Sequence, residues 1–269
     1  MTDATSSSDL FPLSVVVLTK NEEDRLGDCL HSCRWVDDIV VVDSGSRDKT
    51  VEIAKSYGAH VVHQGWLGFG RQRRFAVAQA AHDWVLCLDA DERLTDELSE
   101  SIRRELSGTP GHIYRLARRS FFMGRFLRHG ACYPDWQVRL FDRRFANWNE
   151  APVEETVESP DSPATLQGDL LHFPSLDLKS YLEKQIRFAY IRANYLYRQR
   201  GYVPRPSRVF TRPVLRFFKN YFLRRGFLDG IPGLIHTICC SINCFVKYAR
   251  ITELQRTDKK SSPEAARLK

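Results

Sequence analysis

The stretch DWVLCLDADERL, Asp83 to Leu94, passes from an apolar run into three acids. Its run Val-Leu-Cys-Leu is the continuous apolar pattern that a buried strand requires. Asp89 and Asp91 stand at positions i and i+2, so their side chains point the same way where the chain is extended. The stretch therefore predicts a buried strand that delivers two carboxylates to one edge of a sheet.

Apolar, β-branched segments alternate with amphipathic segments through the first hundred residues. Each predicted strand precedes a predicted helix, in the pairs 13–19 and 21–33, 37–46 and 47–58, 59–64 and 71–82, and 83–89 and 95–106. Asn21 is the expected cap of the first helix. Four such units predict an α/β fold with a mostly parallel sheet and helices on both faces.

Acidic residues follow three of these strands, at Glu22, Asp43, and Asp89 with Asp91. Open sheets of this class bind ligands beyond the carboxyl ends of their strands, although such acids can also be solvated turn or cap residues. Neither glycine-rich phosphate loop, GxGxxG or GxxxxGK[ST], is present. A nucleotide diphosphate held here would therefore need a divalent cation, and Mg²⁺ or Mn²⁺ prefers carboxylate oxygens.

Several segments in order resemble one enzyme family. VVVLTKNEE, VVDSGSRDKTVEIAKSYGA, GFGRQRRFAVAQA and DWVLCLDADERL resemble the family 2 glycosyltransferases, which are inverting enzymes with the GT-A (Rossmann-like) nucleotide-sugar fold. The downstream segments RHGACYPDWQVRLF, LLHFPSLDLKSYLEK and KNYFLRRGFLDGIPGL resemble the lipopolysaccharide core β-glucosyltransferase branch. The resemblance runs from about Leu13 to Arg250.

The resemblance implies roles in a nucleotide-sugar site. Thr19 and Glu22 are expected to line the nucleotide pocket, and Asp43 to contact the base or ribose. Arg73 occupies the family position of a pyrophosphate or sugar contact, although the family usually has QRNFAL where this chain has Gln-Arg-Arg-Phe. Asp89 is expected to help hold the nucleotide.

The same resemblance makes Asp91, with Asp89, the expected ligand of Mg²⁺ or Mn²⁺. Glu92 is expected to be an acid at a helix start and to matter less. Gln137 and Arg139 lie in a strand-like stretch and are expected to meet the diphosphate.

An inverting transfer also needs a base for the acceptor hydroxyl. Glu155 matches the glutamate of the family motif PVHE, although Glu154 replaces the histidine of that motif. Asp135, in YPDWQVRLF, is the rival base, and Glu155 could also be a surface acid.

The second half is strongly basic. The whole chain carries a formal charge of +7, and the segment 179–225 contains many aromatic residues, 13 Lys and Arg, and one acid. The segment 230–246 has no charged residue, and it is either interfacial or a buried helix of the fold. A basic region beside an apolar segment suits an anionic inner-membrane surface, and no nucleic acid is expected.

These observations predict the organisation of the chain. Residues 1–12 and 253–269 are expected to be disordered, 13–175 to form the catalytic domain, and 176–252 to form a helical, basic, membrane-associating region. Within the catalytic domain, 13–108 is the expected nucleotide-sugar half and 109–175 the acceptor half. The seven cysteines are expected to be reduced and mostly buried, since their spacing fits neither zinc nor a disulfide framework.

The resulting hypothesis is an inverting hexosyltransferase that moves glucose from UDP-glucose to the inner core of lipopolysaccharide or a similar lipid-linked oligosaccharide. It would act in the cytoplasm, peripherally on the inner membrane, because the N-terminal segment does not have the pattern of a secretory signal. The alternatives are a sugar nucleotidyltransferase and a non-catalytic protein that binds anionic membrane or nucleic acid.

Overall fold

The computed structural model describes residues 12–175 and 177–261. They form two compact units, the first from 12–118 with 136–172 and the second from 119–135 with 173–261. The hairpin segment 119–135 thus belongs with the helical unit, whereas the sequence had assigned it to the acceptor half of the catalytic domain.

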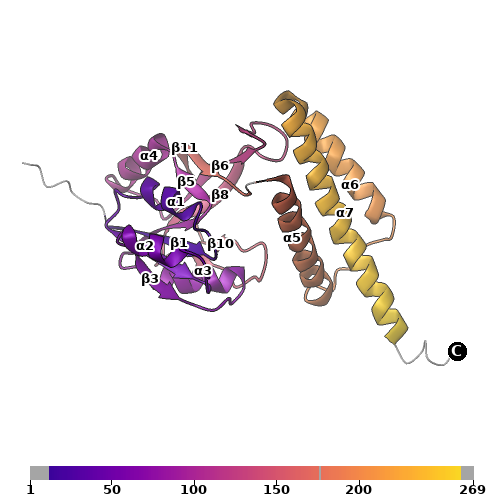
Figure 1. Ribbon diagram of the computed structural model, residues 1–269, viewed down its shortest axis with the longest axis horizontal. Helices are drawn as coiled ribbons and strands as arrows, with labels where there is room; N and C mark the ends of the chain where they lie inside the picture. The colour runs from indigo at the N-terminus through magenta and orange to yellow at the C-terminus, as the bar shows by residue number, and fades with distance from the viewer. Residues whose placement is uncertain (1–11, 176, 262–269) are drawn as a thin grey trace, which may run out of the picture. The chain divides into compact units, whose positions relative to one another are not determined.

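The first unit is built on a mixed sheet (Figure 1). The strands of the protein are β1 (Leu13–Thr19), β2 (Asp38–Asp43), β3 (His60–His63), β4 (Trp84–Asp89), β5 (Glu92–Leu94), β6 (Ile113–Phe122), β7 (Arg125–Phe126), β8 (Asp135–Asp142), β9 (Asn147–Trp148), β10 (Val157–Glu158) and β11 (Ala164–His172). The sheet order is β3-β2-β1-β4-β8-β6-β11-β5, with β7 on β6 and with β9 and β10 as a separate pair.

The parallel part of this sheet comprises β3, β2, β1 and β4, and β8 joins β4 in the antiparallel direction. The helices that follow the parallel strands are α1 (Leu26–Ser32), α2 (Thr50–Ser56), α3 (Phe69–Ala78) and α4 (Asp96–Leu106). The four predicted strand-helix units are therefore confirmed, with the short strand β5 inserted before α4.

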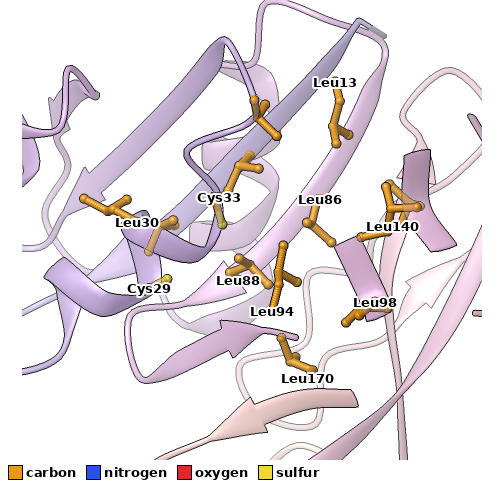
Figure 2. Packing of buried hydrophobic residues seen from close by; sticks show 14 of the residues in the cluster. Leu13, Cys29, Leu30, Cys33, Leu86, Leu88, Leu94, Leu98, Leu140 and Leu170 are labelled. Atoms are coloured by element: carbon orange, nitrogen blue, oxygen red, sulfur yellow. The ribbon is translucent and has the colours of Figure 1, made fainter. Parts of the chain in front are cut away.

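Alternate residues of the central strands pack on opposite faces of the sheet. Val15 and Val17 of β1 lie in one apolar cluster with residues of α1, α2 and α4, part of which Figure 2 shows. Val16 lies in a second cluster with Ala76 and Val77 of α3. Because a strand turns successive side chains to opposite faces, a continuous apolar run suits a sheet covered on both sides.

Asn21 is not the cap of α1, which begins at Leu26. Its backbone has a φ of 54°, its N–H donates to the Ser46 hydroxyl, and its side-chain oxygen accepts from the backbone N–H of Arg47. Asn tolerates this left-handed conformation because its polar group can bond locally. The residue joins the loop after β1 to the loop after β2.

The second unit contains the end of β6 (119–122), the short strand β7 and a helical part. Its helices are α5 (Leu178–Arg198), α6 (Arg208–Phe218), the π-helix η1 (Lys219–Leu223), the 3₁₀-helix η2 (Gly226–Asp229) and α7 (Gly230–Ser261). Both α5 and α6 pack against α7 (Figure 1). Residues 253–261 are thus helical and not part of a disordered tail, while 1–11 and 262–269 lie outside the described residues.

Helix α7 has one packed and one exposed face. Thr237, Cys240 and Cys244 are buried at helical spacing, whereas Ile238 and Ile242 are exposed. In the described part of the chain, the stretch Gly226–Asp258 is long and apolar enough to cross a membrane, but the core helix of a soluble protein can meet the same criteria. The buried face agrees with the predicted alternative of a buried helix, and the interfacial alternative for 230–246 stays a prediction.

All seven cysteines are buried and free, as predicted.

Candidate active site

The carboxyl ends of β2, β1 and β4 lie side by side at one edge of the parallel sheet. In the strand register, Thr19 lies opposite Asp43, and Leu18 lies opposite Asp89. The sequence-predicted residues Thr19, Asp43 and Asp89 are thereby brought to one edge, because parallel strands in register end together.

Asp43 shapes the loop that follows β2. Its carboxylate accepts the backbone N–H groups of Gly45 and Ser46, at 2.9 and 3.0 Å, and the Ser46 hydroxyl at 2.5 Å. Thr19 is 5% exposed, and its buried hydroxyl has no hydrogen-bond partner among the described residues. A buried polar atom without a partner is costly, so the Thr19 hydroxyl is a candidate contact for a bound molecule.

Glu22 lies in the turn after β1, where it pairs with Arg25 at 2.6 Å. Its backbone N–H donates to the Thr50 hydroxyl at the start of α2. The loops after β1 and β2 are therefore fixed to each other at the predicted nucleotide pocket.

A chain of alternating charges lies next to these strand ends. The Arg73 Nε donates to Glu155 at 2.9 Å, and its Nη2 donates to Asp89 at 2.9 Å. The Arg139 Nη2 donates to Asp89 at 2.8 Å and to Glu92 at 2.9 Å. Three predicted site residues, Arg73, Asp89 and Glu155, are thus in direct contact.

Glu92 is fully buried in β5 and is not an acid at a helix start. It pairs with Arg118 at 3.1 Å as well as with Arg139. Arg139 is 2% exposed and pairs with the carboxylates of Asp89 and Glu92, while its expected contact with the diphosphate stays a prediction. Gln137 is half-buried in β8.

The ion pairs between these buried arginines and acids shift the pKa values of the residues that form them. Burial acts to raise the pKa of Asp89, but Arg73 and Arg139 outweigh it, and the pKa lies well below its usual value. Burial acts to lower the pKa of Arg139, and Glu92 and Asp89 raise it above its usual value. Buried ions need such partners, because a charge moved out of water is costly when it is left unpaired.

Arg73 is held in place by its surroundings. Its guanidinium carbon lies 4.6 Å from the centre of the Trp148 ring, and its Nη1 is buried without a hydrogen-bond partner among the described residues. Gly70, one turn earlier in α3, permits the close approach of the loop 149–155, because a Cβ there would lie 2.2 Å from the Asn149 carbonyl oxygen. That approach brings Glu155 to Arg73.

Asp91 has a different neighbour from Asp89. It is 7% exposed, and its Oδ2 lies 3.6 Å from the Nε2 of His172, the last residue of β11. The described residues contain no group of three acids, histidines or cysteines arranged to hold a metal ion. The carboxylate oxygen nevertheless suits Mg²⁺ or Mn²⁺ when phosphate oxygens of a substrate complete the coordination, and the imidazole is a donor that Mn²⁺ accepts more readily than Mg²⁺.

Sequence reasoning did not single out His172. Its position is set by the pairing of β11 with β5, in which His172 lies opposite Glu92. No short-range motif shows this pairing, because the two strands are far apart in the chain. The available signal was a histidine at the end of a strand-like run, LQGDLLH.

Asp135, the rival base, is half-buried at the first position of β8. It belongs to the second compact unit, whereas Glu155 belongs to the first. Glu155 has a side chain 14% exposed and is therefore not a freely solvated surface acid.

The strand ends of this mixed sheet thus carry carboxylates beside a buried arginine. Residues 14–160 match the family model described as glycosyl transferase family 2, and the chain belongs to this family. The family resemblance, the α/β fold and the assignment as a transferase are thereby confirmed.

Two relatives cover most of the chain. An uncharacterized glycosyltransferase of Rickettsia bellii is 29% identical over 260 residues, which covers 90% of this chain and 86% of the relative. The lipopolysaccharide core biosynthesis glycosyltransferase LpsC of Rhizobium meliloti is 28% identical over 248 residues, covering 89% and 92%.

Two solved structures are similar to a limited degree. Glucosyl-3-phosphoglycerate synthase from Mycobacterium tuberculosis, solved with Mn²⁺ and UDP-glucose, is 25% identical and has a TM-score of 0.34, covering 40% of this chain and 43% of that chain. TarS of S. aureus is 15% identical with a TM-score of 0.43, covering 91% of each chain. These similarities are too low to bear on substrate or metal.

Proposed function

We propose that this glycosyltransferase moves a hexose, glucose from UDP-glucose, with inversion, onto the inner core of lipopolysaccharide or a similar lipid-linked glycan. One observation supports the binding site for the sugar donor: Thr19, Asp43 and Asp89 lie at the carboxyl edge of three adjacent strands. The acceptor class rests on the relative LpsC, whose name places it in lipopolysaccharide core biosynthesis.

The donor site would use groups that have unused hydrogen-bonding capacity. The Thr19 hydroxyl and the Arg73 Nη1 are buried without partners among the described residues, and both can donate to the oxygens of a nucleotide diphosphate. Glu22 and Asp43 would bound the nucleotide pocket through the loops that they fix. Asp89 would act mainly by holding Arg73 and Arg139.

Asp91 and His172 are the residues that would hold Mg²⁺ or Mn²⁺, with Asp89 two residues away from Asp91. When bound, the cation would neutralise the charge that develops on the departing nucleotide diphosphate. The role of the protein is to keep a carboxylate and an imidazole at the strand edge, where that diphosphate would lie.

Glu155 is the proposed general base for the acceptor hydroxyl, and Asp135 is the rival. The ion pair to Arg73 fixes the position of Glu155, and a base must lie within hydrogen-bond reach of the proton that it takes. The same contact links the base to Asp89 through a single side chain.

The proposed location is the cytoplasm, with the protein peripheral on the inner membrane through its second unit. Exposed apolar side chains of α6 and η1, such as Phe210 at 72% and Leu223 at 80%, support contact with a lipid surface. Family membership makes the two alternatives, a sugar nucleotidyltransferase and a non-catalytic binding protein, the weaker explanations.

Purified protein incubated with a panel of nucleotide sugars and purified truncated lipopolysaccharide tests this function. We expect nucleotide release and a mass increase of one hexose on the glycolipid, with UDP-glucose as the best donor. An axial product linkage would contradict inversion, since a UDP-glucose donor is axial. Release without any acceptor product across the panel would contradict the acceptor class.

A further inference from the structure

A basic cavity lies within the second unit, apart from the strand-end site. It has a volume of about 350 Å³ and is lined in part by Arg212, Arg216, Lys219, Arg224 and Lys247. No acidic residue is among its lining residues. Cations gathered without an acid repel one another, so the arrangement favours an anion of matching size.

The cavity cations come from two helices that pack together. Arg212, Arg216 and Lys219 are spaced by four and three residues, so they lie on one side of the continuous segment α6–η1. Lys247 comes from α7, is only 8% exposed, and has its Nζ 4.5 Å from the centre of the Tyr248 ring. A lysine this buried is rare in proteins, and here it lines the same cavity as four other cationic side chains.

Asn220 independently points to a ligand. It lines the cavity, it is 4% exposed, and its amide Nδ2 is buried with no hydrogen-bond partner among the described residues. An amide nitrogen only donates. A buried donor surrounded by cations is suited to a group with several acceptor oxygens and negative charge, which describes a phosphate.

Exposed apolar side chains on the same segment indicate the source of that phosphate. Phe210, Val214, Phe218, Phe222 and Leu223 are each more than 50% exposed. Phe210, Val214 and Phe218 recur every four residues along α6, which places them on a side of the helix different from that of Arg212 and Arg216. An amphipathic helix with a cationic side and an aromatic side is typical of a segment lying in a membrane interface.

We propose that this cavity binds the phosphate of an anionic lipid headgroup while the exposed apolar side of α6–η1 enters the lipid surface. Arg212, Arg216 and Lys219 would pair with the phosphate charge, and the Asn220 amide would donate to one of its oxygens. The inference rests on the proposed membrane association of the second unit and not on the transfer chemistry.

Vesicle cosedimentation of the full chain tests the proposal. The vesicles contain phosphatidylcholine with either phosphatidic acid or cholesteryl hemisuccinate, adjusted to equal surface charge. The triple variant Arg212→Gln, Arg216→Gln, Lys219→Gln should lose on the order of 100-fold in partitioning onto phosphatidic acid vesicles, since each well-placed cation contributes roughly fivefold. Asn220→Leu, which has a similar size and no charge but lacks the amide donor, should lose binding to the same vesicles with little change on hemisuccinate vesicles.

The matched control is Arg187→Gln, Arg198→Gln, Arg256→Gln, which removes three exposed cations of the same unit that do not line the cavity. An equal loss in this control, or an equal loss on both vesicle types, would show that only general charge matters and would overturn the site. Circular dichroism melting of each variant must match the wild type.

A soluble source of phosphate is tested separately by calorimetry with inorganic phosphate and glycerol 3-phosphate. Binding to these ions as tight as to phosphatidic acid vesicles would overturn the assignment to a lipid. Hexose transfer to a short, detergent-free acceptor should persist in the cavity variants, so failure of this site and failure of the proposed transferase function are distinguishable.

Discussion

Asp89 and Asp91, two positions apart in the chain, have different surroundings. Asp89 is paired with Arg73 and Arg139, whereas Asp91 lies beside His172. The same sequence pattern thus places one carboxylate in an ion network with two arginines and the other beside an imidazole. The chemistry of each residue is decided by side chains that arrive from other strands and helices.

Asp91→Asn should keep the fold and lose most transfer activity, because it replaces a charged ligand for a hard cation with a neutral amide. The loss should exceed the roughly 10- to 100-fold that is typical for an outer partner of a metal site. The measurement is turnover across a Mn²⁺ titration. Full activity of this variant, or of metal-stripped wild type in EDTA, would refute a metal-dependent mechanism.

Glu155→Gln should lower kcat by about two to four orders of magnitude, the range that removal of a general base costs. UDP-glucose affinity should survive, since the change retains a polar group beside Arg73. Asp135→Asn is the comparison, measured by kcat and by donor binding. If Asp135→Asn abolishes turnover with the fold intact and Glu155→Gln is nearly silent, the base is Asp135.

At the residue scale, the sequence was sufficient for the polar residues that end a parallel strand. Thr19, Asp43 and Asp89 could be placed at one edge because parallel strands in register end together. The pairing of Glu92 with Arg118 and Arg139, and the position of His172, depend on strands β6, β8 and β11, whose order in the sheet has no local signal.

At the scale of elements, the short strand β5 is held in the fold by the buried charge of Glu92. Glu92→Gln should destabilise the protein by about 3–5 kcal/mol, because it leaves Arg118 and Arg139 with a neutral partner in a buried site. The measurement is urea unfolding. Glu100→Gln is the matched control, since Glu100 is 68% exposed in its pair with Arg103, and a surface pair contributes at most about 1 kcal/mol. If Glu92→Gln and Glu100→Gln lower the free energy of unfolding by the same small amount, the ion pairs of Glu92 with Arg118 and Arg139 do not stabilise the protein.

Helix α7 carries a histidine that makes its packing sensitive to pH. Burial and the charge of Arg216 lower the pKa of His236 to about 4, and its ring lies 3.2 Å from the Cys132 sulfur. Below pH about 6.5 the unfolded chain binds a proton that the folded chain does not. The free energy of unfolding should therefore fall by about 2 kcal/mol between pH 7 and pH 5 through this residue.

His236→Gln tests that dependence, because glutamine does not titrate in this range. Urea unfolding at pH 7 and pH 5 should show a smaller loss of stability in the variant than in the wild type. The same loss in both proteins would show that His236 is not the source. His31→Gln, an exposed histidine at the end of α1, is the control and should leave the wild-type dependence unchanged.

Strands and helices were predictable where the spacing of their apolar residues was regular. The four strand-helix units follow from continuous apolar runs and helical spacing, and the structure contains them all. The expected cap at Asn21 was wrong because its side chain bonds to the next loop instead of to the helix. The expected end of the last helix was wrong because α7 continues through a charged segment to Ser261.

At the scale of the whole molecule, the described residues form two compact units. The segment 119–135 was misassigned because its membership depends on contacts with distant residues. For example, the buried Asp229 carboxylate accepts the backbone N–H groups of Arg128 and His129. Such contacts link positions about a hundred residues apart, and no composition shift in the sequence marks them.

The proposed membrane contact of the second unit can be tested through its apolar side alone. Phe210→Ser, Phe218→Ser, Leu223→Ser removes three exposed side chains and leaves every charge in place. Wild type should float with anionic vesicles and less with neutral ones, and binding should weaken with salt.

The triple variant should lose roughly 10- to 100-fold in partitioning, because each apolar side chain that enters the lipid contributes on the order of 1 kcal/mol. The control removes three exposed apolar side chains of the first unit, as Trp66→Ser, Leu67→Ser, Phe145→Ser, and should float like the wild type. Since both triples remove similar apolar area and no charge, a difference between them locates the membrane-binding side. Unchanged flotation of the α6–η1 triple would show that this side stays in water, and the exposed aromatic residues would then need another partner.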